Sequence, residues 1–323
     1  MFSNFKRLSF RHKNNKIWYY TVNYIRQYIP ATFFQKRLEN KLSDCTDFDL
    51  EYIQKRVNYY NRLNKTSELS YQALPISELK LGDELKVYFF DTYEFIRYFN
   101  QNIRALFLFG DIIHVPVEPS FVKSRPIDGT ITNSVVLKLD KVRHFLFVKD
   151  KKAFESKQNM IISRGKALQK PHRLRFLEMY YNHSMCDIGQ VDRGENLQFP
   201  ALRMTLAEHL NFKFILCLEG NDVASNLKWV MSSNSLAVMP IPKYETWFME
   251  GTLIPNYHYV LIKNDYSDLE ERMNYYIQHT DEALKIIQNA HEYVDQFKNK
   301  KQENLISLLV IKKYFEKTGQ KTV

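Results

Sequence analysis

Residues 213–239 read KFILCLEGNDVASNLKWVMSSNSLAVM, and this stretch decides the fold class. It starts with an apolar run, passes through a polar turn that contains Gly220, and ends in a second apolar run. Short apolar runs bounded by turn residues are typical of buried strands, and the segment between them is long enough for a helix. We therefore predict a strand at 213–218, a helix at 222–233 and a strand at 235–239.

The same alternation continues on both sides of this stretch. A predicted strand at 159–163 precedes a predicted helix at 171–181, and a strand at 258–262 precedes a helix at 267–279. A further helix is expected at 244–251. Strands that alternate with helices of this length imply a parallel sheet with helices on both faces. Such α/β sheets bind ligands at the carboxyl ends of their strands, so functional residues are expected in the strand-to-helix turns.

Other elements follow from local patterns. Ser267 and Glu270 have the spacing of a capping box, which supports a helix start at that point. Two more helices are predicted at 281–298 and 302–316. The first half of the chain has the following predicted elements: helix 48–63, strand 85–90, helix 91–101 and strands 105–109, 134–139 and 144–148.

The apolar pattern lapses at 150–159, where we expect a domain boundary. We predict an N-terminal domain at 1–155, a Rossmann-type domain at 156–300 and a C-terminal helix at 301–323 that packs back on the first domain.

Composition and charge narrow the class of protein. The chain has 323 residues, with 46 Lys and Arg against 36 Asp and Glu, which gives a formal net charge of +10. This excess favours an anionic partner: nucleic acid, an acidic membrane or a phosphorylated substrate. Three cysteines without zinc or disulfide spacing suit a reducing compartment. Without a signal-peptide pattern or an 18-residue apolar run, we expect a cytoplasmic protein, including one on the inner face of the cell membrane.

Residues 1–41 are strongly basic, with nine Lys or Arg and one acid, Glu39, and aromatic residues are interleaved among them. This pattern suits a peripheral position on an anionic membrane surface, where aromatic rings lie at headgroup level. It also suits single-stranded nucleic acid, whose bases stack on rings. The third interpretation is an ordinary helix that packs on the body of the protein with a solvated basic face.

Basic residues surround the first strand-to-helix turn of the Rossmann-type domain. Arg164 and Gly165 follow the predicted strand at 159–163, and Arg173 lies on the next helix. A glycine lets the backbone approach a ligand, and guanidinium groups bind phosphate oxygens in a fork. These residues predict a diphosphate site, with a basic surface turn as the other interpretation.

The turn after the predicted strand at 213–218 offers a second set of candidates. A helix that starts here would present free N–H groups and a positive dipole end to a ligand. Because two acids would repel a phosphate, Glu219 and Asp222 are expected to bind sugar hydroxyls or a cation. In the third turn, Glu250 is suited to two ribose hydroxyls, or is a solvated acid. The donor-side candidates of these two turns are Glu219, Gly220, Asn221, Asp222, Ser225, Lys228 and Glu250.

In the first half of the chain, Asp111 ends a predicted buried strand. A carboxylate at a strand end can act as a general base on a hydroxyl, or can simply cap a turn. Nearby His114, Lys123 and Arg125 are the candidates for acceptor-side contacts. The histidines show no metal-ligand spacing, so we predict neither a metal nor another cofactor.

Several spaced elements, in order, resemble glycosyltransferase family 90, most closely its bacterial lipopolysaccharide A protein branch. The elements are EGNDVASNLKW at 219–229, SSNS at 232–235, WFMEGTLIPNYHYV at 247–260, DYSDL at 265–269, RG at 164–165, DIG at 187–189, GD at 110–111 and KSRP at 123–126. The resemblance covers roughly residues 105–295.

The resemblance implies a GT-B fold, in which two Rossmann-type domains face each other across a cleft. It implies inverting, metal-independent transfer of a sugar from a nucleotide-sugar, usually a UDP-sugar, to a hydroxyl. The donor would bind to the domain at 156–300 and the acceptor to the domain at 1–155. By this resemblance Asp111 is the base and Arg164 binds the diphosphate. Where the family's animal members carry an arginine, this chain has Asn226, and Lys228 would supply the charge.

The branch points to lipopolysaccharide core or a related surface glycan as the acceptor. Two alternatives stay open: a protein or capsule acceptor, and a basic nucleic-acid-binding protein without transferase activity.

Overall fold

The computed structural model describes residues 14–43, 48–82, 85–194 and 197–321. By packing, the chain divides into two compact units, and each unit gathers segments that are distant in sequence. Unit 1 contains Asn14 and residues 144–242 and 252–296. Unit 2 contains residues 15–143, 243–251 and 297–321. Both units contain a parallel sheet and helices, so the fold class is α/β, as predicted.

Unit 1 is built on a five-stranded sheet in the order β12-β10-β9-β7-β8, with all neighbouring strands parallel. Its strands are β7 (Gln158–Gly165), β8 (Cys186–Gln190), β9 (Phe212–Leu216), β10 (Leu236–Met239) and β12 (Val260–Leu261). The chain goes from β7 outward to β8 and then returns to the other side of β7 for β9. The strand order therefore reverses between β7 and β9, and this switch point opens a crevice in sheets of this kind.

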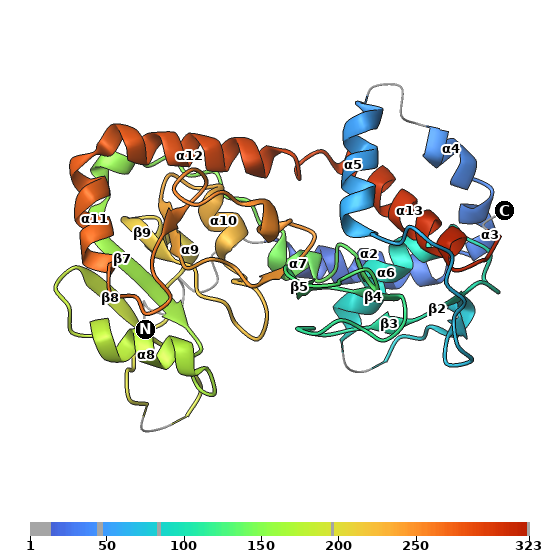
Figure 1. Ribbon diagram of the computed structural model, residues 1–323, viewed down its shortest axis with the longest axis horizontal. Helices are drawn as coiled ribbons and strands as arrows, with labels where there is room; N and C mark the ends of the chain where they lie inside the picture. The colour runs from blue at the N-terminus through green and yellow to red at the C-terminus, as the bar shows by residue number, and fades with distance from the viewer. Residues whose placement is uncertain (1–13, 44–47, 83–84, 195–196, 322–323) are drawn as a thin grey trace. The chain divides into compact units, whose positions relative to one another are not determined.

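Helices flank both faces of the unit 1 sheet (Figure 1). They are α8 (Pro171–Tyr180), α9 (Leu206–His209), α10 (Leu227–Met231), α11 (Leu269–Gln278) and α12 (Thr280–Asp295), with a short 3-10 helix η2 (Phe154–Ser156) before β7. Along β9, Phe214 and Leu216 join the core cluster to which α8, α11 and α12 contribute. Successive strand residues point to opposite faces, so Ile215 points to the other face of the sheet.

Unit 2 contains a smaller parallel sheet, β3-β4-β6, and two antiparallel pairs, β1-β2 and β5-β11. The strands are β1 (Leu74–Pro75), β2 (Arg104–Ala105), β3 (Phe107–Leu108), β4 (Ser120–Val122), β5 (Arg125–Pro126), β6 (Ser134–Val136) and β11 (Tyr244–Glu245). The helices are α2 (Lys16–Gln27), α3 (Ala31–Gln35), α4 (Leu38–Ser43), α5 (Leu50–Tyr60), η1 (Ile76–Glu78), α6 (Lys86–Ile96) and α13 (Lys300–Lys317). Two short helices, α7 (Lys141–His144) and η3 (Glu250–Thr252), lie where the chain passes between the units.

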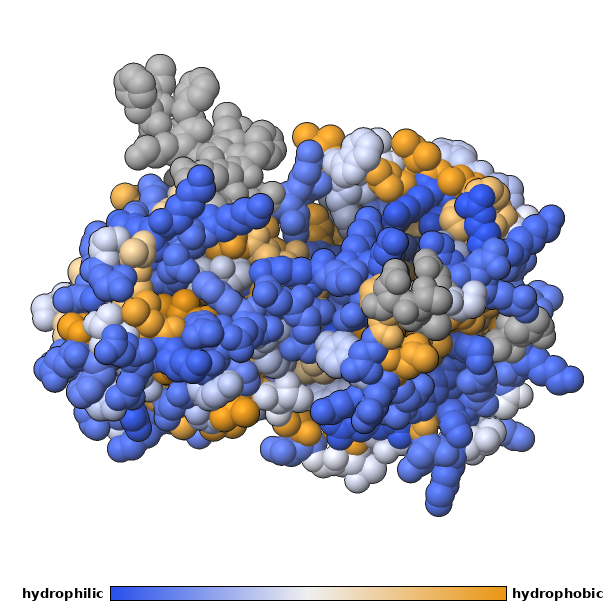
Figure 2. Space-filling model, turned by 90° about the horizontal axis from the view of Figure 1, so that it is seen from above, coloured by the Kyte–Doolittle hydropathy of each residue, from blue (hydrophilic) through white to orange (hydrophobic). Residues whose placement is uncertain are grey.

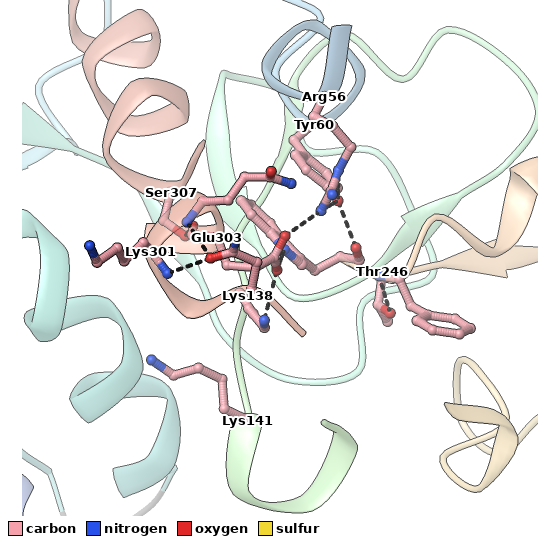
Figure 3. A network of polar contacts seen from close by, with 12 residues as sticks. Arg56, Tyr60, Lys138, Lys141, Thr246, Lys301, Glu303 and Ser307 are labelled. Carbon is pink, nitrogen blue, oxygen red and sulfur yellow. Dashed lines mark hydrogen bonds and ion pairs between the residues drawn. The ribbon is translucent and has the colours of Figure 1, made fainter. Parts of the chain in front are cut away.

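The core of unit 2 forms around α13, which packs against α4, α5 and α6. It also contains buried charges (Figure 3). The Glu303 carboxylate accepts hydrogen bonds from Arg56 Nη2 at 2.8 Å, from Lys138 Nζ at 2.7 Å and from Trp247 Nε1 at 2.7 Å. On the surface face drawn in Figure 2, hydrophilic side chains predominate and hydrophobic ones show as separate small areas.

Two predicted strands of the first half are wrong. Residues 85–90 belong mostly to α6, not to a strand. Their aromatic run resembles a strand because α6 is buried on several sides, between α2 and α13, so no amphipathic period shows. Residues 145–148 form no strand either. There the Val148 amide donates to Ser232 Oγ at 2.9 Å instead of joining a sheet.

Two predicted helices also need correction. The helix predicted at 222–233 spans only Leu227–Met231, after a longer turn in which Arg173 bonds the Leu218 and Glu219 carbonyls. The helix predicted at 244–251 is replaced by β11 and the short η3. There the Glu250 carboxylate accepts from the Thr246 amide at 2.6 Å, and β11 pairs with β5.

The capping box predicted at Ser267 and Glu270 does not form. The Ser267 hydroxyl donates to Asp265 Oδ1 at 2.9 Å, and α11 begins two residues later, at Leu269. The remaining predicted elements are present with shifted ends. The domain roles predicted for residues 1–155, 156–300 and 301–323 stay predictions.

Candidate functional site

A pocket of about 400 Å³ lies in unit 1 at the carboxyl ends of β7 and β9. Its lining includes residues 162–167, at the end of β7 and in the turn after it, and Leu216, Leu218, Ser225 and Asn226 from the end of β9 onward. Pockets of this volume are in the range that binds small molecules. The pocket therefore occupies the switch point of the sheet, where α/β folds bind their ligands.

Arg164 is anchored in the pocket wall by the neighbouring strand. Its guanidinium donates to the Asp187 carbonyl at 2.7 Å, to the Asp187 carboxylate, and to the Leu202 carbonyl at 2.9 Å. The side chain is 9 % exposed, whereas that of Asp187 is 37 % exposed. These contacts fix the arginine in the pocket lining, with part of its charge offset by the aspartate.

Arg173 of α8 connects the two turns that border the pocket. Its Nη1 donates to the Lys166 carbonyl at 2.9 Å, in the turn after β7. Its Nη2 and Nε donate to the Leu218 and Glu219 carbonyls at 2.7 and 2.8 Å, in the turn after β9. Burial lowers the pKa of the guanidinium, and the charge of Asp192 opposes this shift. Arg173 therefore fixes the distance between the two turns.

Gly165 leaves room for the Arg173 guanidinium that connects the two turns. A β-carbon at position 165 would lie 3.3 Å from Arg173 Nη1, tighter than ordinary van der Waals contact. Any larger residue would press on the guanidinium that joins the turns. The predicted donor residues Arg164, Gly165, Arg173 and Ser225 thus all line the pocket.

The other candidates of the second turn do not line this pocket. Glu219 contributes its carbonyl to Arg173 and to the ring of His172, with Nε2 at 2.8 Å. Asp222 is 2 % exposed and Lys228 is fully buried, with its ammonium 5.6 Å from the Phe145 ring centroid. The sugar-binding and charge-stabilising roles expected for Glu219, Gly220, Asn221, Asp222 and Lys228 stay predictions.

Sequence reasoning missed another part of the pocket wall, which comes from residues 203–209 and from Trp229. Arg203 is exposed, and His209 is 8 % exposed with Nδ1 at 2.8 Å from the Thr205 carbonyl. Burial lowers the His209 pKa, although the Thr205 carbonyl opposes that shift. A sequence signal existed here: Thr205 and Glu208 form a true capping box at the start of α9.

In unit 2, charged residues lie at the carboxyl end of each strand of the parallel sheet. Asp111 follows β3, Lys123 follows β4 and Asp140 follows β6. Lys123 is 1 % exposed, and its ammonium donates to the Asp111 carboxylate, which is 25 % exposed. Asp140 was not predicted. It is buried with a left-handed φ of 53°, and it pairs with Arg143 Nε at 3.0 Å.

Burial raises the pKa of Asp140 to about 6, while Arg143 and Lys123 counteract that rise. Burial likewise raises the pKa of Tyr88 to about 12, where Lys123 acts in the opposite direction and Asp111 and Asp140 add to the rise. We call Asp111, Lys123, Asp140 and Arg143 the strand-end cluster. Its carboxylates and cations provide a site that can hold and transfer a proton.

The remaining acceptor-side candidates have different surroundings. His114 is exposed. Arg125 is fully buried, and its Nε donates to Glu245 Oε1 at 2.8 Å while Nη2 donates to the Tyr59 carbonyl at 2.7 Å. Glu250 is 1 % exposed, and its carboxylate binds Thr246. In this structure Arg125 and Glu250 hold the β5–β11 region together, and the contacts predicted for them with acceptor and ribose stay predictions.

The described part of the chain contains no group of three or more His, Cys, Asp or Glu side chains placed to hold a metal ion. None of its helices is long and apolar enough to cross a bilayer. Cys186 and Cys217 are buried free thiols, and Cys45 lies outside the described residues.

Comparison with known proteins agrees with the resemblance drawn from the sequence. The model of glycosyl transferase family 90 matches residues 135–314. The O-glucosyltransferase LpsA of Dichelobacter nodosus is 41 % identical over 264 residues, which cover 81 % of this chain and 82 % of that protein. Both matches include the pocket of unit 1.

Proposed function

The chain belongs to glycosyltransferase family 90 and is a glycosyltransferase, and we propose that it moves a sugar from a UDP-sugar to a glycan hydroxyl with inversion. The acceptor we propose is lipopolysaccharide core or a related surface glycan. The proposal includes a GT-B organisation in which two Rossmann-type domains each bind one substrate. Because the relative is an O-glucosyltransferase, UDP-glucose is the first donor to test.

The observation that carries the donor assignment is the pocket at the switch point of unit 1. Its lining includes the glycine turn at Gly165, the anchored Arg164 and the exposed Lys166 and Arg203. A diphosphate needs such cations because it carries its charge on several oxygens. We place the donor diphosphate against the turn after β7.

We propose that Asp111 is the general base. It takes the proton of the acceptor hydroxyl, and the oxygen forms a bond to the anomeric carbon on the face opposite the nucleotide. The bond from that carbon to the diphosphate oxygen breaks, and UDP leaves with the electron pair. Cationic side chains around the diphosphate stabilise its developing charge, without a requirement for a metal ion.

Calorimetric titration of the purified chain with UDP, GDP, CMP and ADP tests the donor assignment. Each nucleotide is titrated first with EDTA and then with magnesium. We expect selective binding of UDP that survives EDTA, followed by turnover of UDP-glucose in a donor screen. Binding that requires magnesium would overturn metal independence, and absence of nucleotide binding would overturn the donor pocket itself.

A further inference from the structure

Helix α2 is held to unit 2 by one face. Tyr19 donates its hydroxyl to Asp91 Oδ1 at 2.7 Å, and Arg26 Nη1 pairs with Glu94 Oε1 at 2.9 Å. Asn23, on the same face, is 5 % exposed. These contacts fix the position of the helix and leave its other face outward.

The outward face of α2 is apolar. Ile17, Trp18, Tyr24, Ile25 and Tyr28 are 72, 67, 41, 58 and 88 % exposed. At 100° per residue the five side chains fall within an arc of about 120°, which also holds the exposed Thr21, and we call the five the α2 stripe. The Tyr24 ring also packs on Phe90, with ring centroids 5.1 Å apart. Single exposed hydrophobic residues are ordinary, but a continuous row of them marks an interaction surface.

The sequence around the stripe is basic. Lys16 begins α2, and Lys36, Arg37 and Lys41 lie in the segment of α3 and α4 that follows. All four side chains are exposed. The Arg37 guanidinium lies 3.8 Å from the Phe33 ring centroid. Glu39 is the one acid among residues 14–43. Exposed apolar rings on α2 and exposed cations at its start and in the segment after it thus lie close together in the sequence.

An anionic lipid bilayer matches this combination of exposed aromatic rings and cations. Trp and Tyr rings favour the headgroup region of a bilayer, and each Lys or Arg near an anionic leaflet strengthens the attraction to it. At 12 residues α2 is too short to cross the roughly 30 Å hydrocarbon core, so it suits an in-plane position. We propose that the α2 stripe docks unit 2 on an anionic lipid surface. That this brings the enzyme to a membrane-borne acceptor rests on the proposed function.

Tryptophan fluorescence gives a direct readout. Of the chain's three tryptophans, Trp18 is exposed, whereas Trp229 and Trp247 are 8 % and 0 % exposed. Vesicles of phosphatidylcholine with phosphatidylglycerol should shift the emission of the full chain to shorter wavelength and carry it into the pellet on sedimentation. Vesicles of phosphatidylcholine alone should do neither, and salt should weaken the binding. In Trp18→Phe the spectral shift should disappear while sedimentation persists.

Matched serine variants test the stripe itself. Tyr28→Ser combined with Ile25→Ser should weaken vesicle binding roughly tenfold or more, because two exposed apolar side chains no longer partition. Tyr71→Ser is the control, since Tyr71 is another unit 2 tyrosine and is 87 % exposed. It should bind vesicles like the unmodified chain.

The proposal would be overturned by equal binding to neutral vesicles, by a stripe variant that sediments like the control, or by a Trp18 signal that responds to oligonucleotides and not to vesicles. A concentration-dependent dimer that dissociates in the stripe variant would assign the stripe to a second copy of the chain instead. UDP titration of the same variants keeps the two proposals separate. Lost vesicle binding with unchanged UDP affinity supports the lipid surface independently of the donor site.

Discussion

The buried Lys123 ammonium donates a hydrogen bond to the carboxylate of Asp111, and the two residues end neighbouring parallel strands. Lys123 is 1 % exposed and Asp111 is 25 % exposed, so the ammonium contacts the carboxylate from the protein interior. A carboxylate can accept a proton as a general base, and the Lys123 ammonium fixes its position. The arrangement therefore suits an oriented base.

Asp111→Asn should lower the rate of sugar transfer by about two to four orders of magnitude, because general-base catalysis typically contributes that much. The amide keeps the size of the side chain and can still accept a hydrogen bond from Lys123. Donor binding should therefore be unchanged. Turnover measured as UDP release, with UDP affinity measured by calorimetry, checks both expectations.

The control for this substitution is Asp128→Asn, at an exposed position of the same unit. It should transfer sugar at the unmodified rate. Full turnover by Asp111→Asn would show that Asp111 only caps a turn.

Asp140→Asn should change stability in a pH-dependent way. Burial raises the pKa of Asp140 to about 6, above the value of 3.8 for an exposed aspartate. The folded state therefore favours the protonated carboxyl, and stability from this group is lost as the pH rises through about 6. Asparagine does not ionise, and it tolerates the left-handed φ of this position.

We expect Asp140→Asn to be more stable than the unmodified chain by about 1–3 kcal/mol at pH 8 and by much less at pH 4. Urea unfolding at the two pH values measures the difference. A stability difference that is the same at both would contradict the raised pKa.

Gly189→Ala should destabilise unit 1 and weaken donor binding. A β-carbon at Gly189 would overlap the β-carbon of Ala201 and lie 3.2 Å from the Phe199 carbonyl oxygen. Segment 199–201 would have to move away from β8, at the edge of the pocket, at a cost of about 1–3 kcal/mol. Adding Ala201→Gly removes the closest overlap. The double variant should regain part of the lost thermal stability, and a double variant no better than Gly189→Ala would refute the overlap.

Glu303→Gln should destabilise the chain by about 3–5 kcal/mol, because it leaves the buried Arg56 and the mostly buried Lys138 without their shared negative charge. Glu316→Gln on the same helix is the control. Glu316 is 46 % exposed and pairs with Lys312 at the surface, so its loss should cost less than about 1 kcal/mol. Denaturant unfolding measures both variants. Equal effects would mean that the buried charges do not depend on Glu303.

The parallel sheet of unit 1 was predictable because its strands are short apolar runs separated by helices, and residues such as Phe214 and Val238 are buried as that pattern requires. The helix α6 was not predictable, because a helix that is buried on several sides shows no alternation of apolar and polar faces. Distant contacts also decided the local structure at 244–251, where Arg125 pairs with Glu245 from another part of the chain.

Part of the candidate site was visible in the same way. Arg164, Gly165 and Arg173 follow directly from their place after a strand. Asp140 was missed because its position depends on a parallel pairing, β4 with β6, that places three strand ends together. The α2 stripe was anticipated only as an aromatic and basic segment, because exposure is a property of the folded chain.

The affinity of Arg173→Lys for UDP tests the central claim, that the donor binds at the switch point between β7 and β9. Lysine keeps the charge but cannot bond the Lys166, Leu218 and Glu219 carbonyls in one fork. Arg272→Lys, on α11 and outside the pocket lining, is the matched control. We predict UDP binding at least about tenfold weaker in Arg173→Lys and unchanged in Arg272→Lys. Unchanged UDP affinity in a folded Arg173→Lys variant would contradict the claim and place the donor elsewhere.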